Sequence, residues 1–215
     1  MIDFEIIKTG SKGNAVVLNG RVLIDCGVSL RSLSEHYRGL DIVLLTHIHG
    51  DHFNRTTIRN LALERPTLRF GTPSWLVGDL VACGMSKQNI DVYEMDTYYD
   101  YGHFSVAPFS LVHNVPNCGY KLHFHAPFPL GSALYATDTN SMSGIEAKGY
   151  DLYLLEANYG EKEILERIRK KEEAGEHCYE WDVLKNHLSI EKANDWLYEN
   201  MGAHSKYVHI HQHEG

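Results

Sequence analysis

One short stretch constrains this chain more than any other: residues 46–52, Thr-His-Ile-His-Gly-Asp-His, place four candidate metal ligands within six positions. An apolar run of strand length, residues 41–45, lies directly before it, and short runs of this kind are usually buried strands. His47 and His49 are two apart, so in an extended segment their side chains point the same way. Imidazole nitrogens and carboxylate oxygens suit Zn, Mn or Fe. The stretch therefore predicts a rigid metal site at the end of a buried strand.

The pattern His47-x-His49-x-Asp51-His52 resembles the signature of the metallo-β-lactamase superfamily. This resemblance implies a two-metal hydrolase with an α/β fold, an αβ/βα sandwich of two mixed sheets flanked by helices. It says little about the substrate. A polar loop with incidental histidines is the simpler alternative, but four ligands at this spacing after a strand rarely occur by accident.

Length and composition are those of an ordinary globular chain of 215 residues, 43% hydrophobic and 22% charged. This is enough chain to bury a core, so we expect one domain over residues 1–215. No apolar run approaches the ~18 residues of a membrane span. The acidic start, Met1-Ile2-Asp3-Phe4-Glu5, lacks the basic and apolar regions of a signal peptide. We expect no membrane association.

The cysteines indicate the cellular compartment of the protein, and the net charge limits the partners that it can bind. Cys26, Cys83, Cys118 and Cys178 are scattered, with no Cys-x-x-Cys pair, which favours a cytoplasmic protein with reduced thiols. The formal charge of −8 argues against non-specific binding of long nucleic acid, which needs a basic surface. A short phosphodiester remains compatible, because two bound divalent ions would make the site locally positive.

Local patterns predict the elements between the motifs. Asn19-Gly20 is the strongest short signal for a hairpin, and Ser29, Thr72 and Ser189 are candidate helix N-caps. Residues 175–186 look irregular by composition. The expected helices are 29–38, 54–64, 73–83, 161–174 and 190–200. The clearest expected strands are 2–7, 15–18, 21–25, 104–109, 120–125, 133–137 and 150–155.

Two residues of the second half stand at strand ends. A lone histidine such as His113 is more often structural, but the resemblance implies a ligand at this point, before the Gly-Tyr strand that begins at Gly119. Many relatives carry Asp after this histidine, and Asn114 leaves its hydrogen-bond partner open. Asp138 ends an apolar strand, and a carboxylate can join two metals about 3.5–4 Å apart. The resemblance implies that Asp138 bridges, with a loop-start carboxylate as the alternative.

The last ligand is ambiguous in the sequence. The resemblance implies two ions joined by Asp138 and a hydroxide, one held by His47, His49 and His113, the other by Asp51, His52 and a late histidine. His209, His211 and His213 alternate near the end of the chain. His211 fits the family register best, because the last ligand of relatives follows the final strand. In an extended segment all three share a face, so the choice stays open.

Two further motifs narrow the branch of the superfamily. Residues 11–14, Ser-Lys-Gly-Asn, resemble the Ser-x-Gly-Asn loop of YycJ/WalJ-like and PhnP-like proteins. Asp25 ends the strand 21–25, and the resemblance implies that it supports the metal loop from beneath. A strand-end carboxylate that caps a turn is the alternative for Asp25.

Glu156 and His187 suggest the reaction class. Residues 155–158 and 186–189 resemble the places where phosphodiesterase members such as tRNase Z pair a Glu with a His. In that pairing the His donates a proton or hydrogen bond to the phosphate or leaving oxygen, and the Glu orients it. A surface carboxylate and an ordinary loop histidine are the alternatives. The resemblance thus makes Asp51, Glu156 and His187 the candidate catalytic residues.

Together these motifs predict a hydrolase with two divalent ions. Zinc is the expected metal, and manganese and iron are the alternatives. We expect a phosphodiesterase or nuclease that uses a metal-bridging hydroxide. Its substrate would be a short nucleic acid or a small cyclic or nucleotide phosphodiester. A hydrolase of carboxylic esters, thioesters or lactones is the alternative, and a non-catalytic metal-binding regulator is the second. The sequence does not give the oligomeric state.

Overall fold

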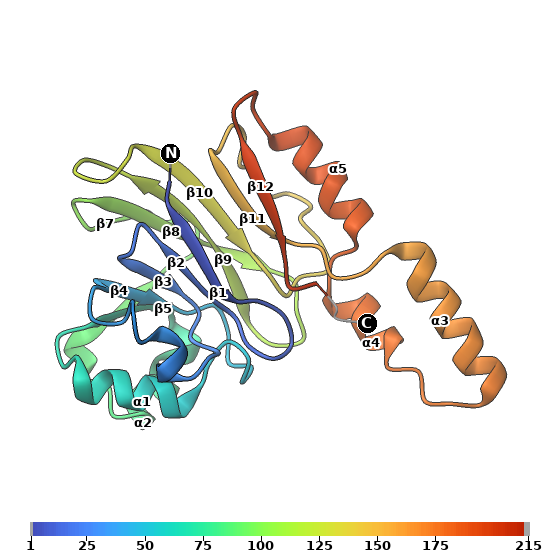
Figure 1. Ribbon diagram of the computed structural model, residues 1–215, viewed down its shortest axis with the longest axis horizontal. Coiled ribbons are helices and arrows are strands. Elements are labelled where there is room, and N and C mark those ends of the chain that lie inside the picture. Colours follow the sequence, from blue (N-terminus) through green and yellow to red (C-terminus); the bar gives the residue numbers. More distant parts are fainter. Residues whose placement is uncertain (1, 213–215) are drawn as a thin grey trace.

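The computed structural model describes residues 2–212 and folds them into two facing sheets of six strands each (Figure 1). The first sheet keeps chain order: β1 (Phe4–Lys8), β2 (Ala15–Leu18), β3 (Val22–Ile24), β4 (Ile42–Leu44), β5 (Arg69–Pro73) and β6 (Ile90–Tyr93). The second sheet runs in reverse chain order: β12 (Lys206–Ile210), β11 (Leu152–Glu156), β10 (Gly131–Ala136), β9 (Asn117–Phe124), β8 (Phe104–Leu111) and β7 (Tyr99–Asp100). Each sheet mixes parallel and antiparallel pairs.

Helices cover the outer faces of the two sheets. Helices α1 (Arg55–Glu64) and α2 (Val77–Ala82) lie under the first sheet, and α5 (Ile190–Asn200) lies over the second (Figure 1). The order of layers is therefore helix, sheet, sheet, helix, which confirms the predicted αβ/βα sandwich of two mixed sheets. Among residues 2–212, no helix has the length and apolarity needed to cross a membrane.

Apolar residues occupy both faces of the central strands, because each face is covered. Val43 of β4 packs with Ile58 and Leu61 of α1 in the layer beneath the first sheet. Its neighbours Ile42 and Leu44 point the opposite way and pack between the sheets with Leu154 of β11. The alternation along β4 follows the two-residue period of a strand.

Parallel pairing brings several strand ends to one edge. In the second sheet Ala136 of β10 lies beside Leu155 of β11, which lies beside His209 of β12. In the first sheet Ile24 of β3 lies beside Leu44 of β4. Polar residues that follow these strands are thus delivered to one rim of the sandwich, where the metal motif also lies.

The expectation of an irregular segment at 175–186 holds for residues 175–179 and is wrong for the remainder. Residues Glu180–Asn186 form a helix, α4, which packs Val183 and Leu184 against Ile164 and Ile168 of α3 (Glu161–Ala174). Lys171 of α3 also pairs with the buried Glu180 at 2.6 Å. The apolar partners of this helix lie on the preceding helix α3, and its own seven residues are too few to show a helical apolar period in the sequence. Helix α3 projects away from the sandwich (Figure 1), whereas the last residue of α4 reaches it, since the carbonyl oxygen of Asn186 lies 3.2 Å from His113 Nδ1.

Two other helix predictions need correction. In the span 29–38 only Leu30–Leu33 is helical, as a 3₁₀ turn, although Ser29 does cap it. This span offers only Leu33 and Tyr37 as buried apolar residues, too few for a longer amphipathic helix. Thr72 and Pro73 belong to β5 and pair with β6, so the expected helix begins one residue later, as a 3₁₀ turn over Ser74–Leu76 that continues into α2. Pairing between strands outweighs the local capping signal there.

Leu154 tests the packing between the sheets. It is fully buried there, so Leu154→Ala should lower the free energy of unfolding by about 2–5 kcal/mol through lost burial and the cavity left behind. Leu130→Ala is the matched control, because Leu130 is 74% exposed, and it should change stability by less than about 0.5 kcal/mol. Denaturant unfolding followed by circular dichroism measures both. Similar effects at the two positions would contradict this account of the core.

Candidate metal centre

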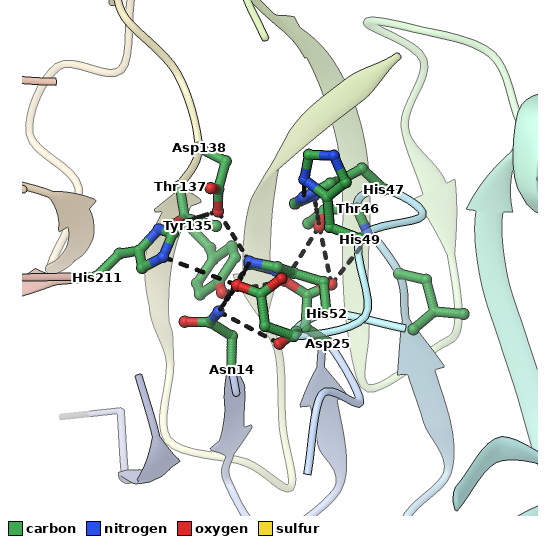
Figure 2. A network of polar contacts seen from close by, with 12 residues as sticks. Asn14, Asp25, Thr46, His47, His49, His52, Tyr135, Thr137, Asp138 and His211 are labelled. Atoms are coloured by element: carbon green, nitrogen blue, oxygen red, sulfur yellow. Dashed lines mark hydrogen bonds and ion pairs between the residues drawn. The ribbon is translucent and has the colours of Figure 1, made fainter. Parts of the chain in front are cut away.

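One buried carboxylate holds the loop after β4 from below. Asp25 Oδ1 accepts the backbone N–H and the hydroxyl of Thr46, at 3.0 and 2.9 Å. Asp25 Oδ2 accepts Nδ1–H of His52 at 2.7 Å, and the hydroxyl of Tyr135 from β10 at 3.2 Å (Figure 2). Asp25 therefore ties both ends of the loop to the second sheet. It also fixes the His52 ring so that Nε2 faces the site.

The loop turns sharply within this frame. The backbone N–H groups of His52 and Phe53 both donate to the carbonyl oxygen of His49, at 2.9 and 2.7 Å. The turn brings the carbonyl oxygen of Asp51 so close to Gly27 that an added Cβ there would lie 1.6 Å from it. Only glycine at position 27 allows the loop to seat at this depth.

Three imidazoles converge on one point. His47 Nε2 lies 3.2 Å from His49 Nδ1, and His113 Nε2 lies 3.3 Å from the same His49 nitrogen. The opposite nitrogens are occupied: His113 Nδ1 donates to the carbonyl oxygen of Asn186 at 3.2 Å, and His47 Nδ1 lies 3.0 Å from the Thr46 hydroxyl. The lone pairs of the three inward nitrogens face one another at short distance. One cation bound by all three nitrogens would relieve this repulsion.

A second group of donors lies beside the first. His52 Nε2 is 3.5 Å from Asp51 Oδ2, and His211 Nε2 is 3.9 Å from that same oxygen. Asp138 stands between the groups: its Oδ2 lies 2.8 Å from His52 Nε2, and its Oδ1 lies 3.9 Å from His113 Nε2 (Figure 2). A carboxylate in this position can serve both groups of donors, one through each oxygen.

The donor chemistry fits transition-metal ions. Within residues 2–212 the candidate ligand atoms form overlapping groups, each with its atoms within 4.8 Å of one another. The groups are His47, His49 and His113; His47, His52 and Asp138; Asp51, His52 and His211; and Asp138, Glu156, His187 and His211. Imidazole nitrogen with carboxylate oxygen is a donor set typical of zinc, manganese and iron sites. The residues present therefore suit divalent metal ions.

Charges inside the site are strongly coupled. Burial would lower the pKa of His211, but Asp138 and Glu156 outweigh it and raise that pKa to about 10. Burial acts the same way on His52, whose pKa is nevertheless held well above its ordinary value by Asp138 and Asp25. Burial and the neighbouring His52 instead lower the pKa of His47. A cation that binds this centre must therefore displace protons from His52 and His211, whose protonated forms the carboxylates stabilise.

Three residues of the site have left-handed backbones. The φ angles of Asp25, Asp138 and His211 are 60°, 55° and 52°. Residues other than glycine rarely adopt this region, and strain of this kind persists only where the surroundings enforce it. Around Asp138, Asn117 Nδ2 donates to the carbonyl oxygen of Asp138 at 2.7 Å. Each of the three directs its side chain inward just after a strand ends.

Glu156 and His187 meet at the rim. His187 Nδ1 donates to Glu156 Oε1 at 2.7 Å, and the backbone N–H of Thr139 donates to Glu156 Oε2 at 2.9 Å. Glu156 is fully buried, whereas the side chain of His187 is 20% exposed. His187 Nδ1 also lies 3.6 Å from Asp138 Oδ1. Glu156 therefore presents the other edge of the His187 ring toward solvent, beside the donor groups.

The geometry separates the late histidines. His211 lies among the donors, with Nδ1 3.0 Å from Asp138 Oδ2. His209 does not share its face: it lies on β12 beside Tyr207, with the two rings tilted and their centroids 5.1 Å apart. Strand β12 ends at Ile210, and the left-handed step at His211 breaks the alternation that the sequence implied. His213 lies outside the described residues.

Two contacts were not foreseen from the sequence. Asn14 lies against the donors, with Nδ2 2.8 Å from His52 Nε2, although its loop was noted only as a family motif. The partner of His113 is a backbone carbonyl, that of Asn186, so the change to Asn114 leaves His113 oriented. No residue type signals a backbone partner. A buried Asn in a glycine-rich loop was the available signal for Asn14.

Comparison with known sequences agrees with this architecture. The model of one protein family, described as beta-lactamase superfamily domain, matches residues 20–211. A curated relative, ribonuclease Z of Clostridium kluyveri, is 30% identical over 118 residues, which are 47% of this chain and 39% of the relative. The chain thus matches well under half of that relative's length.

Comparison with solved structures finds the same fold. The metallo-β-lactamase fold protein YhfI of Bacillus subtilis has a TM-score of 0.76 at 17% identity, over 100% of this chain and 88% of that one. The short form of human tRNase Z has a TM-score of 0.72, also at 17% identity, over 99% and 92%. At these identities the likeness concerns the fold.

Zinc titration of the metal-free protein near pH 7 should release protons, because His52 and His211 hold theirs against carboxylates and must yield them to a cation. His211→Ala should release fewer protons and bind zinc more weakly. His209→Ala is the matched control and should behave as wild type. Calorimetry in buffers of different ionisation enthalpy counts the protons. Loss of proton release in His209→Ala alone would contradict the placement of the late histidines.

Proposed function

The chain belongs to the β-lactamase superfamily, whose domain covers residues 20–211, and from this premise we propose that it is a metal-dependent hydrolase of phosphodiesters. The observation that carries the proposal is the 2.7 Å contact between His187 and Glu156 beside the metal-ligand candidates. A hydrolase of carboxylic esters has no need of a proton donor at this place. The relatives named ribonuclease Z and tRNase Z point to the same bond class.

The proposal places two divalent ions in the centre. His47, His49 and His113 would hold one ion, and Asp51, His52 and His211 the other. Asp138 would contact both, since its two oxygens face the two groups. When bound, such ions lower the pKa of water and offset negative charge on the attacked group. Asp51, at the turn of the loop, would supply a carboxylate oxygen to the second ion beside His52 and His211.

His187 is the proposed proton donor. Its Nδ1 is committed to Glu156, so Nε2 is the nitrogen that can meet a phosphate oxygen or the leaving oxygen. Glu156 is held in turn by the backbone of Thr139, which leaves the pair little freedom to reorient. A positioned acid of this kind typically contributes about 10²–10⁴-fold in rate.

Charge narrows the proposed substrate. The net charge of −8 disfavours long nucleic acid, which is bound through a basic surface. A short oligonucleotide, or a small cyclic or nucleotide phosphodiester, carries its negative charge close to the metal centre, so its binding does not need a basic surface. Parallel assays of metal-loaded protein on bis-p-nitrophenyl phosphate, single-stranded DNA and a lactone panel test the class. Turnover of lactones alone would overturn the proposal.

Metal analysis should find close to two transition-metal ions per reconstituted chain. Asp138→Ala should lose a large share of this metal, because one carboxylate serves both groups of donors. Asp41→Ala is the matched control: Asp41 is exposed, pairs with Arg21, and should leave the metal content unchanged. One ion or none in wild-type protein after reconstitution would refute the two-metal assignment.

His187→Ala should lower phosphodiesterase kcat about 10²–10⁴-fold while the metal content stays near two, because it removes a proton donor and no ligand. Glu156→Gln should lose less, since the His remains but its orientation is weaker. The loss should shrink with a p-nitrophenol leaving group, which departs without a proton, and be largest with a sugar hydroxyl. Steady-state kinetics with both leaving groups measures it. If His187→Ala instead strips metal, the assigned role is wrong.

A further inference from the structure

The loop between β1 and β2, residues 9–14, touches donors of both sheets. The backbone N–H of Asn14 donates to the carbonyl oxygen of Asp51 at 2.6 Å, and the Asn14 side chain is 1% exposed. At the start of the same loop, Thr9 Oγ1 accepts the backbone N–H of His211 at 2.7 Å, from 202 residues further along the chain. One loop thus lies against both Asp51 and His211.

The backbone fixes the orientation of the Asn14 amide. Its Oδ1 accepts the N–H of Gly10 at 2.9 Å, and its Nδ2 donates to the carbonyl oxygen of Gly10 at 3.1 Å. Nδ2 consequently faces the metal centre, 3.4 Å from Asp51 Oδ2 and 2.8 Å from His52 Nε2 (Figure 2). An amide nitrogen can only donate, so it steadies the Asp51 carboxylate, whereas the lone pair of His52 Nε2 stays with the candidate metal ligands.

Thr9 joins the Asn14 amide to the last donor. Its hydroxyl lies 3.4 Å from Asn14 Oδ1 and can donate to it while accepting from the His211 N–H. A continuous chain of polar contacts therefore runs from the His211 backbone through Thr9 and Asn14 to the Asp51 carboxylate. It crosses from the second sheet to the first.

His211 needs this contact more than an ordinary loop residue does. Its φ of 52° is unfavourable for an L side chain, and that left-handed step directs the imidazole into the centre. The step is held from two sides, by Thr9 at the N–H and by Asn158, whose Nδ2 donates to the His211 carbonyl oxygen at 2.7 Å. Removing the Thr9 hydroxyl leaves one of these holds.

We propose that Thr9 and Asn14 are positioning residues, which couple His211 to Asp51 and so hold together the second of the two metal sites. This inference rests on the proposed function, since it concerns one ion of that centre. It predicts that the second ion depends on the Thr9 hydroxyl, whereas the ion held by His47, His49 and His113 does not. Positioning contacts of this kind typically change metal affinity about 10–100-fold.

Thr9→Val is the informative variant, because it keeps the shape of the side chain and removes the hydroxyl. Thr9→Ser should restore wild-type behaviour. Thr57→Val is the matched control: Thr57 donates to a backbone carbonyl, that of Val28, at 2.6 Å, and it is not hydrogen-bonded to any candidate ligand. Zinc retention is measured against a graded series of chelators.

Thr9→Val should hold one of its two ions about 10–100-fold more weakly and the other as wild type does. Thr9→Ser and Thr57→Val should retain both. Equal retention of both ions by Thr9→Val, or equal weakening of both, would overturn the coupling.

Hydrogen exchange of the metal-free chains separates this inference from the proposed function. If Thr9 couples the two sheets, Thr9→Val should speed amide exchange in the segment that contains His211 and also in residues 49–53, while Thr57→Val changes neither. Faster exchange in the first segment alone would mean a purely local contact and would overturn the coupling. This readout holds whether wild-type protein binds two ions or fewer.

Discussion

The fully buried carboxylate of Asp25 is the interaction on which the centre depends. Its contacts come from both ends of the metal loop and from Tyr135 of the other sheet. A buried carboxylate without partners is costly, and breaking a buried charged pair typically costs about 3–5 kcal/mol. The two sheets must therefore close with Thr46, His52 and Tyr135 in place. The positions of the donors follow from the need to satisfy this one charge.

Much of this arrangement was predictable, because its signals are local. Asp138 lies two residues beyond the apolar strand β10, Glu156 is the last residue of β11, and parallel pairing of these strands delivers both to one rim. The cluster of ligand candidates at 47–52 is recognisable from the sequence alone. By contrast, His211 could not be separated from His209 by spacing, since the separation comes from a left-handed step that no residue type requires. Helix α4 was missed for a related reason, because the apolar partners of its short face lie on α3.

The donors hold one another in place through charge as well as contact. Asp138 lies against His52 and His211, and these two histidines lower its pKa well below the ordinary value, although burial alone would raise it. The same contacts raise the pKa of each histidine. The opposite charges of Asp138 and the two histidines thus stabilise one another, and the same contacts fix the positions of the three side chains.

The contact between Thr9 and His211 spans 202 residues of chain, and this has a kinetic consequence. Contacts so distant in sequence form only after much loop-closure entropy has been lost, which slows folding. The loop at 47–52 can form early from neighbouring strands, but the complete set of donors exists only once β12 has docked beside β11. An ion that needs the complete set then stabilises the finished fold over every intermediate that lacks β12. Binding of such an ion would therefore favour folding only once that last strand is in place.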